Sequence, residues 1–289
     1  MTLLEVPEAV FQERYEKVPF KLRHPLREHP AFSLVALRAL ALRLPRADVL
    51  HRRGEVALDA HPLEVNAQYP HDLSLEETFD RLQESNGYIV VAAPERDAAF
   101  RHLADALMRD LLELDDTITG FSSRLIIASG NSVAPFQLEH GHGVHLQVHG
   151  RQLASVWDPS NPDVFDDVAR ERVLANRLEV VPWRDELFLS EQRFELFPGE
   201  ALHEPFIAPH LWRTCEELSV SWHVVFHNER TEACAAVHKA NGWLRRLGVE
   251  PRPHGASAAV DFAKALGVRM YRTVTGGERA PPVVLAPES

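Results

Sequence analysis

The sequence has few cysteines, no long apolar run and no excess of basic residues. Only Cys215 and Cys234 occur in 289 residues, and their spacing is not that of a disulfide scaffold or a thiolate zinc site. No apolar run approaches the ~20 residues that span a bilayer, and the charged N-terminus does not resemble a signal peptide. The net charge of −11 argues against partners such as nucleic acids or anionic membranes. We therefore predict a cytoplasmic protein with reduced thiols.

Several sequence motifs of enzymes are also missing. The chain contains no GxGxxG or GxxxxGK[ST] phosphate loop and no GxSxG nucleophile elbow, so nothing supports a nucleotide-binding enzyme or a serine hydrolase. What is present is an ordinary globular composition, with 45% hydrophobic and 25% charged residues. The chain also has 16 histidines, of which four lie close together at His140, His142, His145 and His149. That cluster raises the question of a metal site.

The periodicity of apolar residues divides the chain into three segments. Residues 1–117 are mostly helical, as in "SLVALRALALRL" and in "SLEETFDRLQES" with its capping box, and "GYIVVAA" adds one strand. Residues 118–228 change to a period of two, which predicts seven short strands and one helix. These strands are "SRLIIAS", "GVHLQVHG", "LASVWD", "LEVVPW", "RFELFPG", "EALHEP" and "LSVSWHVVFH". Residues 229–289 predict two helices and a loose tail. The pattern indicates a mainly β sandwich or small barrel with helical flanks.

Polar residues at the end of one extended run have the spacing of metal ligands. Gln137 and Glu139 are two residues apart and so share one face, and His210 follows much later in "PGEALHEPFIAPHLW". A short-range pair followed by a distant histidine is the spacing of a 2-His-1-carboxylate triad, which binds Fe(II) and leaves positions open for substrate and dioxygen.

The segments "APFQLEHGHGVHLQVHGRQ" and "PGEALHEPFIAPHLW" carry a resemblance to a known family. The chain resembles the bacterial cupin-like proteins of the Jumonji C family, which are related to Fe(II)- and 2-oxoglutarate-dependent protein hydroxylases. The resemblance implies a double-stranded β-helix, the cupin or jelly-roll barrel, with N-terminal and C-terminal helices. It also implies a homodimer that forms through the C-terminal helices.

The chain departs from the family pattern at five positions of the implied site. Gln137 replaces the first histidine ligand, and Glu139 replaces the aspartate ligand. The other three substitutions are Ala134 for a threonine, Gly143 for an asparagine and Gln152 for the lysine that anchors 2-oxoglutarate. Loss of the lysine removes a charge-assisted contact of ~1.5–3 kcal/mol, which argues against 2-oxoglutarate binding. His210 is unchanged. We therefore expect a divergent or inactive member with a degenerate triad of Gln137, Glu139 and His210.

Two alternatives to this expectation stay open. In the first, an active metal-dependent oxygenase uses a rearranged site, in which Glu139 and His210 bind Fe(II) or zinc together with His140 or His142. In the second, the histidines fill a polar barrel mouth and the protein is a non-catalytic cupin that binds a small molecule or a protein. In either case Trp212 and His223 are candidates to line the pocket, whereas the sequence does not name the substrate.

Overall fold

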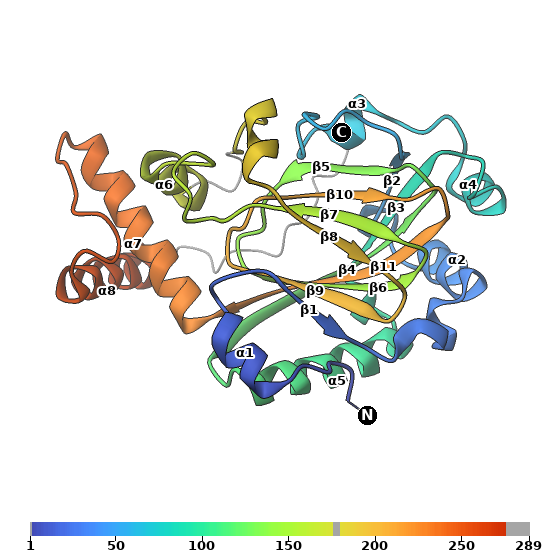
Figure 1. Cartoon of the computed structure of the whole chain (residues 1–289), viewed down its shortest axis with the longest axis horizontal. Coiled ribbons are helices and arrows are strands. Elements are labelled where there is room, and N and C mark those ends of the chain that lie inside the picture. The colour runs from blue at the N-terminus through green and yellow to red at the C-terminus, as the bar shows by residue number, and fades with distance from the viewer. Residues whose placement is uncertain (1, 176–179, 276–289) are drawn as a thin grey trace.

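Two antiparallel β-sheets lie face to face at the centre of this protein, in a computed structural model that describes residues 2–175 and 180–275 (Figure 1). The larger sheet has the strand order β1 (Phe20–Arg23), β9 (Glu200–Glu204), β6 (His142–His149), β11 (Ser219–Asn228), β4 (Ile118–Ala128), β3 (Gly87–Ala92) and β2 (Val49–Arg53). The smaller sheet has the order β5 (Val133–Gln137), β10 (His210–Thr214), β7 (Gln152–Val156) and β8 (Gln192–Leu196). Apolar side chains from both sheets meet between them, as in a jelly-roll.

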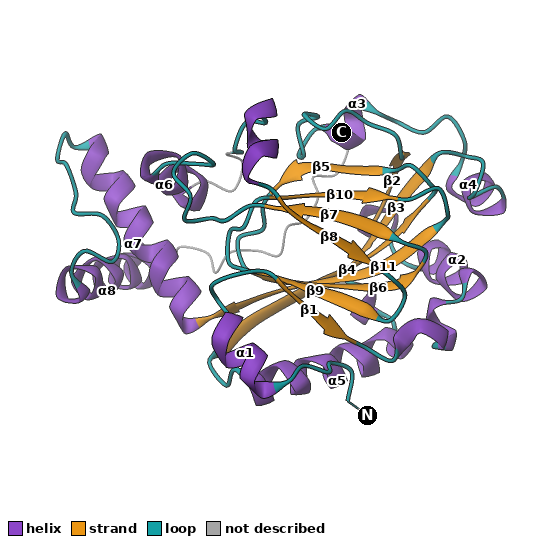
Figure 2. Ribbon diagram, viewed as in Figure 1, coloured by secondary structure: helices purple, strands orange, loops and turns teal. Residues whose placement is uncertain are grey.

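Helices flank the two sheets. They are α1 (Glu8–Arg14), α2 (Leu34–Arg43), α3 (Val65–Gln68), α4 (Leu75–Asp80), α5 (Ala98–Leu114), α6 (Asp167–Ala175), α7 (Glu229–Arg246) and α8 (Ala258–Thr275). Figure 2 shows α1 and α5 beneath the larger sheet, and α7 and α8 projecting from the opposite side of the molecule to α4. Among the described helices, none combines the length and apolar composition that a membrane span requires.

Alternation along the strands of the larger sheet decides which side chains face which layer. On β4, Leu125 and Ile127 join the core beneath the sheet, together with the apolar face of α5. Ile126 and Ala128 point the other way, into the space between the sheets. The same alternation places Arg124 on that inner side, where it lines a cavity. The inner layer is therefore apolar at one end and polar at the other.

The same rule places His142 on the outer face of the larger sheet. His142 is two residues before Val144 on β6, and Val144 belongs to the core beneath the sheet. The His142 ring stacks on Tyr15, with ring centroids 5.1 Å apart, and on Phe226 at 5.4 Å. The ring of His203, from β9, lies 5.4 Å away on the same face. His142 is therefore part of an aromatic layer between the sheet and α1.

The structure confirms most of the predicted elements and corrects three points. The helices predicted at "SLVALRALALRL" and "SLEETFDRLQES" form, and the second begins with the expected capping box of Ser74 and Glu77. The strand predicted at "LEVVPW" is wrong for residues 180–183, which form no strand, while residues 176–179 lie outside the described part of the chain. The tail at 276–289 also lies outside it.

The remaining corrections concern strands that were not predicted. Segment 1–117 contributes β1, β2 and β3 to the larger sheet, where we expected a single strand, so the flank and the barrel share one sheet. β10 was also missed as a strand, and β5 was not among the seven predicted strands, although Gln137 was expected at the end of an extended run. They are only five residues long, and β5 contains Pro135, so their extended form depends on pairing with each other across more than 70 residues of chain.

We expect His142 to make the stability of the protein depend on pH. Burial lowers the pKa of His142 to about 4, from an ordinary value of 6.5, and both ring nitrogens are buried without a hydrogen-bond partner. As the pH falls from 6.5 towards 4, the unfolded chain therefore binds a proton that the folded chain does not. This uptake lowers the free energy of unfolding, by an amount on the order of 3 kcal/mol.

The variant His142→Phe should remove this loss, because a phenylalanine ring keeps the stacking and cannot be protonated. Urea denaturation at pH 7 and pH 5 measures the effect. We expect the difference in unfolding free energy between the two pH values to shrink in His142→Phe and to stay unchanged in a control variant at an exposed histidine, His102→Gln. An unchanged pH dependence in His142→Phe would contradict the assignment.

Candidate functional site

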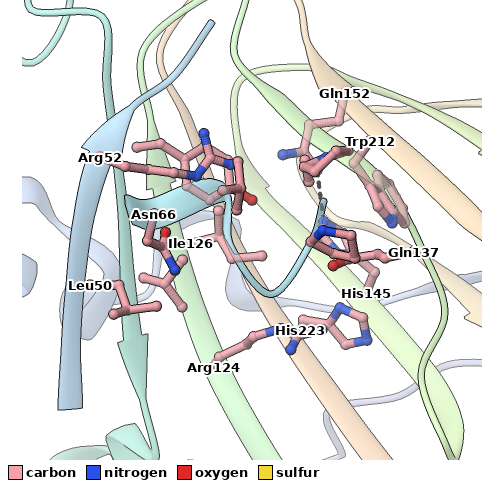
Figure 3. Close-up of a pocket in the computed structure, with 16 residues that line it drawn as sticks. Leu50, Arg52, Asn66, Arg124, Ile126, Gln137, His145, Gln152, Trp212 and His223 are labelled. Carbon is pink, nitrogen blue, oxygen red and sulfur yellow. Dashed lines mark hydrogen bonds between the residues drawn. The ribbon is translucent and has the colours of Figure 1, made fainter. Parts of the chain in front are cut away.

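The candidate site lies between the two sheets, at the polar end of the inner layer (Figure 3). A cavity of about 90 Å³ opens there, and a second one of about 300 Å³ adjoins it. Arg124 and His223 line both cavities, so they stand at the boundary between them. Of the six predicted pocket residues, five line the smaller cavity, namely Ala134, Gln137, Gln152, Trp212 and His223.

A β-bulge brings Gln137 and His210 together. In the pairing of β5 with β10, His210 is opposite Gln137 and Trp212 is opposite Ala134, so that β5 has one extra residue between the two pairs. Without the bulge, alternation would place Ala134 and Gln137 on opposite faces. With it, both line the cavity. The structure thus assembles two of the three positions of the implied metal triad side by side.

Glu139, the third position, is held by an arginine from another strand. The Arg124 guanidinium, from β4, forms an ion pair with Oε1 of Glu139 in the loop after β5. Burial works against the Glu139 charge, but Arg124 outweighs it and holds the pKa of Glu139 below its usual value. The carboxylate that the family pattern would offer to a metal therefore has a cationic partner within the protein.

Glu204, near the end of β9, occupies the centre of the buried polar groups. Its Oε1 accepts a hydrogen bond from Nε1 of Trp212 (3.1 Å) and lies 3.6 Å from Nδ1 of His210. Its Oε2 lies 3.5 Å from Nε2 of His223. A Cβ atom at Gly143 would lie only 2.5 Å from this Oε2, so a larger residue there would displace the Glu204 carboxylate.

The protonation states around Glu204 follow from its burial. Burial raises the pKa of Glu204, and the charge of Glu139 adds to the shift. Burial also holds the pKa of His223 well below its usual value, so the imidazole is neutral at pH 7. The Glu204 carboxyl group thus lies next to a neutral imidazole that lines both cavities.

His145, on the inner face of β6, forms a wall of the smaller cavity. Its ring stacks on Trp212, with centroids 3.7 Å apart. Burial lowers the pKa of His145 to about 3, and Nε2 donates a hydrogen bond to Oε1 of Gln152 (2.6 Å). Gln152, at the position of the family's anchoring lysine, is therefore engaged within the protein and contributes no charge.

Arg52 supplies a second guanidinium to the smaller cavity. It extends from β2 and lies over the ring of Tyr88, 3.8 Å from its centroid. It donates hydrogen bonds to the backbone carbonyls of Val133 (2.8 Å) and Arg53 (2.6 Å). Among the described residues no carboxylate forms an ion pair with Arg52, so its charge in the cavity is not neutralised by the protein.

Two predicted ligands do not reach the site. His142 lies on the outer face of the larger sheet, because alternation on β6 turns it away from the inner side on which His145 lies. His140 follows Glu139 directly, but its Nε2 is 3.0 Å from the carbonyl oxygen of Val173, near the end of α6. The rearranged set of Glu139 and His210 with either histidine is therefore not assembled.

The residues present do not fit a facial triad with anchored 2-oxoglutarate. Nε2 of His210 is buried without a hydrogen-bond partner, which suits a ligand atom. However, Gln137 offers a neutral amide and Glu139 is paired with Arg124. Within the described part of the barrel, no three ligand atoms of His, Cys, Asp or Glu lie within 4.8 Å of one another.

Sequence reasoning missed Arg124, Glu204 and Arg52. The sequence contains a signal that could have revealed the first two. Alternation in "SRLIIAS" places Arg124 on the same face as the apolar Ile126, and alternation in "EALHEP" places Glu204 on the same face as the apolar Leu202. A charged residue on the apolar face of a predicted strand marks a buried polar site. Arg52 gives no such signal, because β2 was not predicted.

Comparison of the sequence with protein-family models and with curated proteins gives no match. Solved structures of the ribosomal oxygenase YcfD from Escherichia coli do match. The structure of YcfD with cobalt and succinic acid is 19% identical over 99% of this chain and 70% of that chain, with a TM-score of 0.52. The structure with cobalt and 2-oxoglutarate is 20% identical over 97% and 69%, with a TM-score of 0.52.

These structures agree with the fold that the sequence resemblance implied. Their likeness to this chain extends over nearly its whole length, including the helices on both sides of the barrel. At this level of identity the likeness concerns the fold and not the reaction. The chain has the jelly-roll fold of the oxygenase-like cupin proteins of the Jumonji C type.

Proposed function

We propose that the barrel is a binding pocket for a small carboxylate-bearing molecule, and that it does not carry out Fe(II)- and 2-oxoglutarate-dependent oxygenation. The observation that carries this proposal is the ion pair between Arg124 and Glu139. The Arg124 guanidinium is always positively charged, and it lies against the carboxylate that a metal would need as a ligand. Binding of a dication there would require the pair to separate and would leave the Arg124 guanidinium without its partner.

The charge of the smaller cavity supports a carboxylate as the ligand. Arg52 brings a positive charge that no described acidic residue balances, and burial makes such a charge costly unless an anion joins it. Guanidinium groups bind carboxylates through paired hydrogen bonds. Asn66, Gln137 and Gln152 line the same cavity and add neutral polar groups. The volume of about 90 Å³ suits a molecule of a few heavy atoms.

The alternative of an active oxygenase rests on Nε2 of His210 and Nε2 of His223, which are both buried without a hydrogen-bond partner. YcfD has been solved with cobalt and 2-oxoglutarate, and His210 is the one position of the implied triad that is unchanged in this chain. A measurement of iron binding therefore distinguishes the carboxylate-binding pocket from the active oxygenase.

We expect the wild-type protein to bind Fe(II) weakly and the variant Gln137→His to bind it at least about tenfold more tightly, because an imidazole is a far better iron ligand than an amide. Anaerobic Fe(II) titration measures this difference, and Gln83→His, at an exposed position, serves as the matched control. Tight iron binding by the wild type, together with release of succinate from 2-oxoglutarate, would refute the proposal.

We expect succinate to bind the metal-free wild-type protein. We also expect the substitution Arg52→Met to weaken that binding about tenfold or more. A charge-assisted hydrogen bond contributes ~1.5–3 kcal/mol, and ~1.4 kcal/mol corresponds to a factor of ten. Calorimetric titration in the presence of EDTA gives the affinities, with acetate and glutarate as shorter and longer probes.

Arg53→Met is the matched control, since Arg53 is the exposed neighbour of Arg52 and does not line the cavity. Circular dichroism establishes that each variant folds. If none of the three carboxylates binds the wild type, or if Arg52→Met binds them equally well, a carboxylate is not the ligand.

We also propose that two chains pair through α8, as the family resemblance implies. Phe262, Leu266, Met270 and Val274 are exposed and recur every four residues, so they form an apolar stripe on one side of α8. Figure 1 shows α7 and α8 extending away from the sheets, where a second copy has access to them. The cytoplasmic location and the absence of nucleic-acid binding stay predictions.

For the dimer, the double variant Leu266→Glu, Met270→Glu should convert the protein to a monomer, because carboxylates in the apolar stripe would be buried without partners. Light scattering after size exclusion gives the mass. Val35→Glu, which changes an exposed valine on α2, should leave the dimer intact. A wild-type protein that is monomeric at micromolar concentrations would contradict this proposal.

A further inference from the structure

A second cluster of ligand-type side chains lies outside the barrel, between α7 and α8. Cys234 and His238 are four residues apart on α7 and so lie on the same side of the helix, and His254 lies in the connection that leads to α8. The Sγ atom of Cys234 and one nitrogen of each histidine all lie within 4.8 Å of one another. Among the described residues, this group alone brings three such atoms so close together.

Unsatisfied polar atoms at this cluster point to a missing ligand. Nδ1 of His238 is buried and has no hydrogen-bond partner. Asp261, in the first turn of α8, has a buried Oδ1 without a partner, while its Oδ2 accepts a hydrogen bond from the N–H of Gly255 (2.8 Å). A buried polar atom without a partner costs free energy, and a cation bound at the cluster would give Nδ1 of His238 a partner.

We propose that Cys234, His238 and His254 bind a zinc ion that joins α7 to the start of α8. Sulfur and imidazole nitrogen are the donors that zinc prefers in tetrahedral sites. Zinc requires distances of about 2.3 Å to sulfur and about 2.0 Å to nitrogen, so the three atoms must approach one another by less than about 1.5 Å. His254 is exposed on its loop and can make that adjustment. Asp261 Oδ1 or a water molecule takes the fourth position.

The charges near the cluster are compatible with a dication. Burial raises the pKa of the Cys234 thiol to about 11, so zinc must displace its proton on binding. The resulting thiolate and the Asp261 carboxylate together carry the two negative charges that neutralise zinc. Arg230 and Arg170 are nearby, but each has its own carboxylate, Glu16 at 2.6 Å and Asp167 at 2.5 Å. Burial lowers the pKa of His238 to about 3, so its imidazole is neutral and able to coordinate a metal at pH 7.

The access route and the consequence of binding also follow from the structure. A cavity of about 280 Å³, lined by Cys234, His254 and Asp261, leads from the solvent to the cluster. Zinc bound there would close the loop between α7 and α8 and would fix the position of α8 against α7. This site is separate from the barrel, so its occupancy does not depend on the function proposed for the barrel.

The first test is the metal content of the full-length, untagged protein from zinc-supplemented cultures. We expect nearly equimolar zinc in the wild type, and its loss in Cys234→Ser and in His238→Gln. The control variants Cys215→Ser, at the other cysteine, and His210→Ala, in the barrel, should keep the zinc. Loss of zinc in His210→Ala with retention in Cys234→Ser would place the metal in the barrel and overturn the proposal.

A second measurement starts from the wild-type protein, so its main result does not depend on how the variants fold. Cobalt(II) added to the chelator-treated wild type should produce the thiolate-to-cobalt charge-transfer absorption of a cysteine-ligated site. The absorption should persist in Cys215→Ser and should disappear when zinc is added. In competition with a chelating dye, His254→Gln should bind zinc at least about tenfold more weakly than the wild type. A wild type that contains no zinc and gives no cobalt band would refute the site.

Discussion

The ion pair between Arg124 and Glu139 is the interaction on which the interpretation of the barrel depends. Arg124 extends from the larger sheet and Glu139 follows a strand of the smaller one, so the pair joins the two sheets across the polar end of their interface. A buried charge is tolerated only with a partner, and removing either residue would leave the other uncompensated. The pair thus fixes the geometry of the site and occupies the carboxylate that an oxygenase would give to iron.

Several of the groups around this pair contact one another within the protein. Glu204 accepts a hydrogen bond from Trp212 and lies between His210 and His223, while Gln152 and His145 form a hydrogen bond with each other. Gly143 leaves the space that the Glu204 carboxylate needs. These contacts are incomplete, because Nε2 of His210, Nε2 of His223 and Oε2 of Glu204 are buried without a hydrogen-bond partner. Arg52 adds a charge that no described carboxylate pairs with in the cavity.

The histidine cluster shows which features of the site could be predicted from the sequence and which could not. Its residue pattern identified the fold, whereas the departure from a metal triad that Gln137 indicates stays a prediction. The histidines themselves were less informative, because four neighbouring positions on a strand and a loop point in different directions. His145 lines the cavity, His142 packs on the outer aromatic layer, and His140 contacts the carbonyl of Val173. Alternation separates His142 from His145, and only a correct assignment of the strand reveals it.

The sequence by itself determined the class of the fold, the helices with strong amphipathic patterns and caps, and the positions at which the chain departs from the family pattern that it resembles. These features depend on local periodicity, which acts over a few residues. Only the tertiary structure decided that Arg124 meets Glu139, that a bulge turns Gln137 towards the cavity and that Cys234 and His238 meet His254. The two short strands β5 and β10 were likewise decided by pairing across the chain. Such contacts depend on the register of segments that are distant in sequence, and no local pattern encodes that register.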